Sequence, residues 1–208
     1  VLADRGLLQV RPRLDGPDLP AARVGGSGDS RPPRGVAGLP ALYEEMLGAE
    51  LPLGGSETSA LRAFTPRFSE QCEELVAAGI EPTVQHDDLH MNNVYVKDGA
   101  LRVLDWGDAS VAHPFFSLFE TVRFLVEMNG LPGGDPLFAR LRDAYLEPWG
   151  SDHRATFDLA LRVGGIAHSI AWLHQREALQ EADQRGFDGG FAHIVRLASR
   201  RALRVSGT

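Results

Sequence analysis

"VQHDDLHMNNVYVKDGALRVLDWGDA", residues 84–109, contains five aspartates and two histidines among apolar residues that are typical of strands. Two short strands, 93–97 and 101–104, are predicted on either side of the dipeptide Asp98-Gly99. An Asp-Gly pair favours the tight two-residue turn of an antiparallel β-hairpin. The sequence therefore predicts a hairpin that carries polar side chains at its open end.

The polar groups at the open end of this hairpin are expected to meet. Asp88 and Asn93 lie at the start of the first strand, and Asp105 follows the second. Antiparallel strands of similar length bring these two ends side by side. Two carboxylates and an amide oxygen form a hard oxygen ligand set, which suits Mg²⁺ better than zinc. The spacing thus predicts a magnesium site.

From Leu39 onward the rest of the chain shows the apolar spacing of helices. Ser56 is expected to cap one helix, and Pro66 is expected to open the next one. In that second helix the predicted buried stripe consists of Phe68, Cys72, Leu75 and Val76. We interpret Cys72 as a core residue rather than a reactive thiol. Asp135-Pro136 is expected to open a later helix. The predicted helices span 39–48, 56–65, 66–79, about 115–126, 136–147, about 151–180 and 191–202. These elements predict an α+β protein that is mostly α, with a small antiparallel hairpin at its centre.

Residues 1–38 differ in composition from the rest of the chain. Residues 1–10 have the pattern of a short strand and turn, whereas residues 11–38 are rich in Gly and Pro and contain no aromatic residue. Such a segment buries too little apolar area to offset the entropy of ordering it, so we expect a mobile loop or linker. The predicted boundary divides the chain into 1–38 and 39–208.

Composition narrows the classes of function. The 208 residues are 43% hydrophobic and 24% charged, which is typical of one globular domain, and the net charge is −7. An acidic chain is a poor nucleic-acid binder and suits a cationic ligand or a metal. The single cysteine forms no internal disulfide, and we see neither a membrane-spanning run nor a signal peptide. We therefore expect a cytoplasmic protein without nucleic-acid or membrane partners, and composition leaves its oligomeric state open.

The order of residues in 84–109 also has a familiar form. His86-x-Asp88-x-x-x-x-Asn93 follows the pattern of the protein-kinase catalytic loop, and Asp105-Trp106-Gly107 stands where kinases carry D-F-G. The variant "HDDLHMNNVYV…VLDWGDA" most resembles the aminoglycoside phosphotransferase/choline kinase family, which typically carries H-G-D-L-H-x-x-N followed by I-D-W-G. The resemblance extends over about 39–204. It implies a protein-kinase-like fold, mainly its C-terminal lobe.

What the resemblance implies is transfer of a phosphoryl group from ATP, with Mg²⁺, to a hydroxyl of a small molecule. Asp88 would accept or orient the proton of that hydroxyl, and Asn93 and Asp105 would hold the metal ion. His86 and His90 are expected to support the loop rather than to react. Trp106 is expected to be a core residue.

Some positions depart from the pattern of the family. Asp87 stands where Gly is usual, and it either adds a carboxylate beside Asp88 or points into solvent. His113 and Ser117 replace two common Asp residues, the second of which usually braces the catalytic loop.

The acceptor site is less clearly marked in the sequence. His168 and Trp172 lie one helical turn apart in a region that lines the acceptor site in similar proteins. Trp172 either faces a cation or a sugar ring or packs between helices with His168. Asp108 either meets an amine or caps the next turn. The resemblance implies ATP and a small-molecule alcohol or amino alcohol as partners, and the acidic residues favour a cationic acceptor such as an amino sugar or an amino alcohol.

The sequence contains no Gly-rich loop followed by a phosphate-binding Lys, and its only Lys is Lys97. The N-terminal lobe of a kinase-like enzyme is therefore expected to be largely absent, with residues 1–38 holding its remnant and the hinge. Three interpretations remain open: a phosphotransferase lobe, a non-catalytic remnant that binds a ligand or partner through the acidic cleft, and a metal-dependent phosphoesterase. The third would use His86, Asp87, Asp88, His90 and His113.

Overall fold

The computed structural model describes residues 35–176, 190–196 and 198. These residues are mostly helical, as the sequence predicts, and they include two small antiparallel sheets. In chain order the elements are η1 Val36–Gly38, α1 Leu39–Gly48, α2 Gly55–Ala77, β1 Thr83–Gln85, η2 Met91–Asn93, β2 Val94–Lys97, β3 Ala100–Val103, η3 Trp106–Asp108, β4 Ser110–Ala112, η4 Pro114–Ser117, α3 Leu118–Glu127, α4 Pro136–Leu146, η5 Ser151–His153 and α5 Arg154–Arg176, where η marks a short 3₁₀ helix. Residues 190–196 form a further helical turn.

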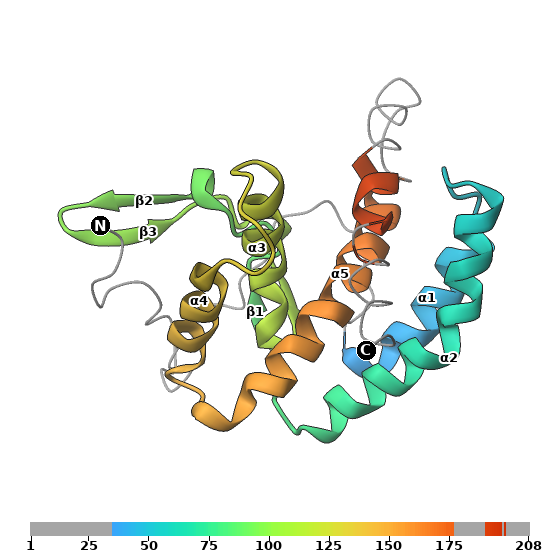
Figure 1. Cartoon of the computed structure of the whole chain (residues 1–208), viewed down its shortest axis with the longest axis horizontal. Helices are drawn as coiled ribbons and strands as arrows, with labels where there is room; N and C mark the ends of the chain where they lie inside the picture. The colour runs from blue at the N-terminus through green and yellow to red at the C-terminus, as the bar shows by residue number, and fades with distance from the viewer. Residues whose placement is uncertain (1–34, 177–189, 197, 199–208) are drawn as a thin grey trace.

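Helices α1, α2 and α5 form one part of the core (Figure 1). Tyr43 of α1 is fully buried, its ring centroid lies 4.7 Å from that of Phe68, and its hydroxyl donates a hydrogen bond to the carbonyl of Leu61. Pro40 lies near the first turn of α1, where a backbone N–H would have no acceptor within the helix. Because proline has no N–H, it costs no hydrogen bond at this position. The predicted bounds of this helix, 39–48, are confirmed.

Helix α2 corrects the prediction of two helices that meet at Pro66. It is one helix of 23 residues, it begins after Gly54 rather than after Ser56, and Pro66 lies inside it. The buried side chains Leu61, Phe64 and Phe68 follow one helical stripe across the proline. Burial of that stripe outweighs the hydrogen bond that Pro66 does not donate.

The end of α2 behaves as predicted. Gly79 has a φ of 67°, the left-handed conformation that terminates many helices. Cys72 is buried, which confirms its place in the core, and burial together with the charge of Glu73 raises the pKa of its thiol. Val76, by contrast, is 50% exposed, so its predicted place on the buried stripe is wrong.

The predicted hairpin is confirmed. Strands β2 and β3 are antiparallel, and Asp98 and Gly99 both have positive φ, 52° and 74°, as a tight primed turn requires. At the open end the amide of Leu104 donates a 2.8 Å hydrogen bond to the carbonyl of Asn93. The hairpin extends away from the helices (Figure 1).

A second two-stranded sheet was not predicted. β1 pairs with β4 in antiparallel register, with Val84 opposite Val111. Each strand has three residues, which is too short for a period-two pattern to be recognised. This sheet places the loop after β1 next to the segment that follows Asp105.

Helices α3 and α5 pack closely, and two glycines permit this approach. A Cβ atom at Gly164 would lie 3.0 Å from the ring of Phe116, and one at Gly165 would lie 2.7 Å from the ring of Phe119. α5 is continuous through this pair. The glycines of α5 therefore bring its middle turns against η4 and α3.

The structure confirms the predicted start of α4 and most of the predicted apolar stripe, and it corrects the prediction for Trp106. Asp135 caps α4 by accepting a hydrogen bond from the amide of Leu137, as expected. The apolar stripe from Phe115 to Leu125 is buried, although Val126 is 36% exposed. Trp106 is 44% exposed and is not a core residue, because its indole stands at the open end of the hairpin, where its N–H donates to the carbonyl of Val103.

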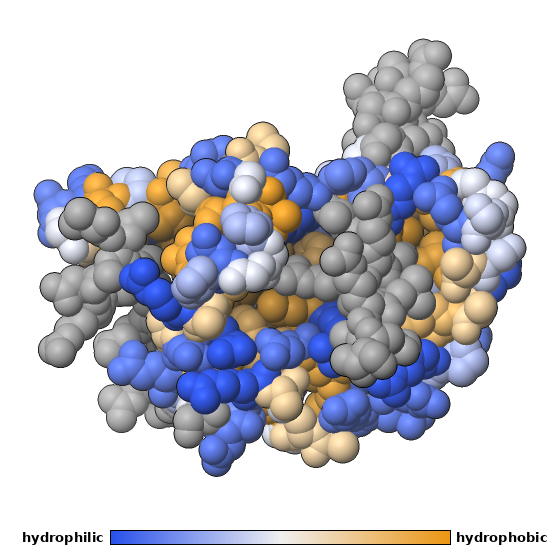
Figure 2. Space-filling model, in the orientation of Figure 1, coloured by the Kyte–Doolittle hydropathy of each residue, from blue (hydrophilic) through white to orange (hydrophobic). Residues whose placement is uncertain are grey.

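Parts of three predictions lie outside the described residues: the strand and linker in 1–34, the end of the helix predicted for 151–180, and the last helix beyond 198. Residues 36–38, predicted as part of the loop, form η1 instead, because Val36 is buried against the core. Polar residues cover much of the face along α2, α4 and the start of α5, and apolar residues are visible over the hairpin and α3 (Figure 2). Among the helices that the structure describes, none combines the length and apolarity that a membrane crossing needs.

Candidate functional site

The loop between β1 and β2 begins with a backbone reversal at Asp87. Asp87 has a φ of 54°, a left-handed conformation that Asp tolerates better than most residues. The amide of Asp88 then donates a 2.7 Å hydrogen bond to the carbonyl of His86. The Asp87 carboxylate accepts a 2.6 Å hydrogen bond from the hydroxyl of Ser110 on β4, so it is held at the loop rather than free in solvent.

Asp88 is held by two neighbouring side chains. The Nδ2 amide of Asn93 donates to the backbone carbonyl of Asp88 at 2.9 Å and to its Oδ2 at 3.0 Å. On the other side of the carboxylate, Nε2 of His90 lies 3.3 Å from Oδ1. Since 37% of the Asp88 side chain remains exposed, the carboxylate is both oriented and accessible.

The loop that carries Asp88 rests on α3. The ring of His90 stacks on Phe124, with centroids 4.8 Å apart and planes 10° apart. The hydroxyl of Thr121 donates a 2.6 Å hydrogen bond to the carbonyl of Leu89. These two contacts hold the loop from beneath, and neither Thr121 nor Phe124 stands out in the sequence from an ordinary helical surface.

His86 is buried, with 3% of its surface exposed. Its Nε2 lies 2.6 Å from the carbonyl of Leu104, to which it donates, and its ring contacts that of Trp106 at a centroid distance of 4.8 Å. His86 therefore ties the start of the loop to the end of β3.

Asp105 stands directly after the residue that faces Asn93 at the open end of the hairpin. Its backbone is left-handed, with a φ of 59°, and its side chain is exposed. The Leu104–Asn93 hydrogen bond fixes the separation of the two strand ends.

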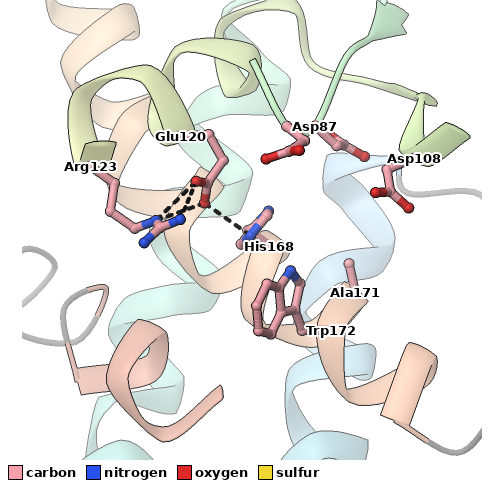
Figure 3. Close-up of a pocket in the computed structure, with 8 residues that line it drawn as sticks. Asp87, Asp108, Glu120, Arg123, His168, Ala171 and Trp172 are labelled. Atoms are coloured by element: carbon pink, nitrogen blue, oxygen red, sulfur yellow. Dashed lines mark hydrogen bonds and ion pairs between the residues drawn. The ribbon is translucent and has the colours of Figure 1, made fainter. Parts of the chain in front are cut away.

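Asp88 lines a cavity of about 140 Å³. Figure 3 shows this cavity from close by. Three carboxylates line one part of it: Asp87, Asp88 and Asp108, which come from the loop after β1 and from η3. Glu120 and Arg123 of α3 and His168, Ala171 and Trp172 of α5 line the remainder. The structure thus brings Asp88, Asp108, His168 and Trp172, all singled out from the sequence, to one cavity.

Glu120 and Arg123 form the charged wall of this cavity, and sequence reasoning missed both. Glu120 is 2% exposed, accepts three hydrogen bonds from Arg123, and lies 3.0 Å from Nε2 of His168 (Figure 3). Burial alone would raise the pKa of the Glu120 carboxyl, but the hydrogen bonds and charges of His168 and Arg123 outweigh it and lower the pKa to about 2. The one available signal was a Glu on the apolar stripe of a helix, three residues before an Arg.

The ion pairs continue from the cavity to residues 190–198. Arg123 also donates to Glu127, and Glu127 lies 2.8 Å from Nε2 of His193. Arg196 forms two hydrogen bonds with Glu57 near the start of α2. Residues 190–196 are thereby fastened to α3 and α2.

His113 and Ser117, which replace two Asp residues common in similar proteins, both form hydrogen bonds that support the fold. Ser117 donates a hydrogen bond to the side chain of Gln85 on β1, which holds the strand before the loop rather than the loop itself. His113 caps η4 by accepting from the amide of Phe115, and burial lowers the pKa of its imidazole to about 4.

His113 therefore does not join the acidic loop. In the described part of the chain, no group of three or more His, Cys, Asp or Glu side chains is placed to hold a metal ion. The metal-dependent phosphoesterase that combined His86, Asp87, Asp88, His90 and His113 stays an interpretation of the sequence.

One comparison with known proteins connects this geometry to a family. The model of the phosphotransferase enzyme family matches residues 13–160, which is more than half of the chain. No curated protein and no solved structure matches. The matched range includes the loop around Asp88 and the hairpin, and it ends within α5 before His168 and Trp172.

Proposed function

The chain belongs to the phosphotransferase enzyme family, and from this premise we propose that it moves the γ-phosphoryl group of ATP to a hydroxyl of a small, amine-bearing molecule. The observation that carries the proposal is the setting of Asp88. Its carboxylate is oriented by Asn93 and His90, remains accessible, and faces a cavity. A positioned carboxylate beside an acceptor site is the arrangement that phosphoryl transfer to an alcohol needs.

In the proposed reaction Asp88 accepts the hydrogen bond of the acceptor hydroxyl and takes its proton as the oxygen attacks the γ-phosphorus of ATP. The bond between that phosphorus and the β,γ-bridging oxygen breaks, and ADP leaves. Asn93 and His90 fix the two carboxylate oxygens, so that little reorganisation is needed when the acceptor arrives. Thr121 and Phe124 support the loop from α3 and keep Asp88 at the edge of the cavity.

The donor atoms at the hairpin end fit a magnesium ion. Asn93 uses its amide nitrogen for Asp88, which leaves the amide oxygen as its ligand atom, and the Asp105 carboxylate is exposed. Both are the hard oxygen donors that Mg²⁺ prefers. Asn93 and Asp105 would hold the ion, and when bound it would neutralise charge on the phosphates.

The charges around the cavity favour a cationic acceptor. Asp87, Asp88 and Asp108 carry negative charge there, while the positive charge of Arg123 is already paired with Glu120 and Glu127. At about 140 Å³ the cavity is smaller than the roughly 300–1,000 Å³ of drug-sized ligand sites, so it suits a small amino alcohol or one amino-sugar ring. Trp172 would cover one face of that ligand.

The test is a search for phosphorylated product by mass spectrometry. The 208-residue chain is incubated for long periods with millimolar Mg-ATP and a panel of small amino alcohols. We expect slow transfer, because the sequence contains no Gly-rich loop and Lys to cradle the phosphates. Asp88→Asn should lower the rate further by about 10² to 10⁴, the usual effect of losing a general base.

Asp98→Asn is the matched control, since it makes the same change of charge at the exposed turn of the hairpin, where Asn tolerates positive φ. Equal rates for wild type and Asp88→Asn would remove Asp88 from its role. Amine binding without product from any amine would instead favour the non-catalytic ligand-binding remnant.

A further inference from the structure

The wall of the cavity formed by Trp172 has a glycine directly behind it. A Cβ atom at Gly190 would lie 3.2 Å from Cζ3 of Trp172 and 3.7 Å from Cη2. These two carbons form the outer edge of the six-membered ring. In Figure 3 the opposite side of the indole, with its nitrogen, points toward His168 and the cavity. The indole therefore lies between Gly190 and the space that an acceptor would fill.

Gly190 cannot simply retreat from the ring, because its helical turn is fastened at two points. His193 lies 2.8 Å from Glu127 of α3. Arg196 donates two hydrogen bonds to the carboxylate of Glu57 on α2. The apolar side chains Phe191, Ile194 and Val195 of the same turn are buried in the core. Residues 190–196 thus form a fixed support behind Trp172.

A side chain at position 190 would consequently move the indole. A contact of 3.2 Å to a Cβ is tighter than ordinary van der Waals packing, so the ring must shift by a few tenths of an ångström. The tightly packed interior offers little room, whereas the cavity is open. The ring would therefore shift toward the cavity and reduce it.

We propose that Gly190 is a specificity-determining residue for the acceptor, because its missing side chain sets how far the Trp172 indole stands back from the cavity. The inference rests on the proposed function, in which this cavity holds the acceptor. It predicts that larger residues at position 190 select smaller amines. The residue acts through Trp172 and touches no substrate itself.

The experiment has two arms on the 208-residue chain. The first compares the indole N–H signal of Trp172 in ¹⁵N-labelled wild type, Gly190→Ala and the control Gly134→Ala, a position where an added Cβ meets nothing within 4 Å. The second measures by calorimetry the binding of a small probe, ethanolamine, and a larger one, glucosamine. Gly190→Ala should move the Trp172 signal and weaken glucosamine binding several-fold more than ethanolamine binding, because the displaced ring takes space from the larger amine first.

A double-mutant cycle with Trp172→Phe tests the route of the effect. Phe lacks the outer ring edge, so in that background Gly190→Ala should no longer distinguish the two probes. An unmoved Trp172 signal, or equal losses for both probes, would overturn the inference. If wild type binds neither amine, the amine-acceptor proposal fails, and with it the selective role of Gly190. A Trp172 shift would then report packing alone.

Discussion

Asp87 combines an unusual backbone conformation with a place in the wall of the cavity. Its left-handed φ of 54° costs an L-residue with a Cβ about 1–2 kcal/mol, and its carboxylate accepts a hydrogen bond from Ser110 that contributes about 1 kcal/mol. Asp87→Ala should therefore destabilise the protein by about 1–2 kcal/mol in urea unfolding, because it keeps a Cβ and loses the bond. Asp87→Gly should be less harmful, since Gly adopts this conformation freely. Equal stability of the Ala and Gly variants would show that the backbone at this position is not strained.

His113 predicts a dependence of stability on pH. Burial lowers the pKa of its imidazole to about 4, whereas an unfolded His titrates near 6.5. Between these values the unfolded state binds more protons, so this contribution to stability is complete above about pH 6.5 and is lost as the pH falls toward 4. The loss should reach about 3 kcal/mol at the acid end.

The comparison for this prediction is His113→Asn, because Asn can still accept the capping hydrogen bond from the amide of Phe115. Urea unfolding at several pH values should show a steeper acid loss for wild type than for the variant. Parallel curves would mean that His113 is readily protonated in the folded protein.

At the scale of residues, the sequence identified groups with a strong local pattern and missed those defined by packing. The spacing of His86, Asp88 and Asn93 within one loop is readable, since the three lie within eight positions. Glu120 was missed because its partners, Arg123 and His168, come from two helices, and its burial depends on the packing of α3 against α5. Gly190 was missed for the same reason, because only the fold places it behind Trp172.

At the scale of elements, α2 shows burial overriding a local signal. Pro66 inside the helix leaves one carbonyl without its usual amide donor and strains the preceding turn. Pro66→Ala should stabilise the protein by about 1–2 kcal/mol, which is the helix cost of proline, about 3 kcal/mol, less about 1 kcal/mol for the greater freedom of the unfolded chain. Thermal or urea unfolding measures this difference.

Pro82→Ala serves as the control, because Pro82 is exposed and lies outside any helix. At Pro82 the substitution only increases the conformational entropy of the unfolded chain, so a small loss of stability is expected. A loss at Pro66 as large as the loss at Pro82 would show that the helix already accommodates its proline without cost.

Long elements and elements that begin or end at characteristic turn residues could be predicted from the sequence, whereas short strands could not. Asp98-Gly99 specified the β2–β3 hairpin, and Asp135-Pro136 specified the start of α4. The β1–β4 pair joins strands that are distant along the chain, with Thr83 opposite Ala112, and no local signal reports such a pairing. That unpredicted pair places Ser110 against Asp87.

At the scale of the whole molecule, the net charge of −7 and the acidic cavity predict salt-sensitive amine binding. Screening shortens from about 30 Å at 0.01 M salt to about 8 Å at 0.15 M. The affinity for ethanolamine should therefore fall several-fold over this range in calorimetry, and Asp108→Asn should reduce both the affinity and its salt dependence. Asp152→Asn, exposed in η5, is the control for net charge. Salt-independent binding would contradict a charge-based acceptor site.

Nucleotide binding is the other property of the whole molecule. With Asn93 and Asp105 as oxygen donors but Lys97, on the hairpin, as the only lysine of the sequence, the chain should bind Mg-ATP with a Kd of about 1 mM or weaker. Isothermal titration measures this value, with Asp105→Asn expected to abolish the remaining magnesium dependence. Micromolar binding would show that other residues of the chain cradle the phosphates.

The turn of the β2–β3 hairpin lies at the opposite end from the polar side chains of the candidate site. The Leu104–Asn93 hydrogen bond closes the end that carries the polar side chains, while Asp98 and Gly99 stand at the far end, away from the helices (Figure 1). Because side chains alternate between the two faces of a strand, a ribbon lengthened by matched pairs of residues keeps its register. We therefore expect the turn to tolerate insertions. A fluorophore, an affinity tag or a fused domain inserted between Asp98 and Gly99 should leave the carboxylates at the other end undisturbed.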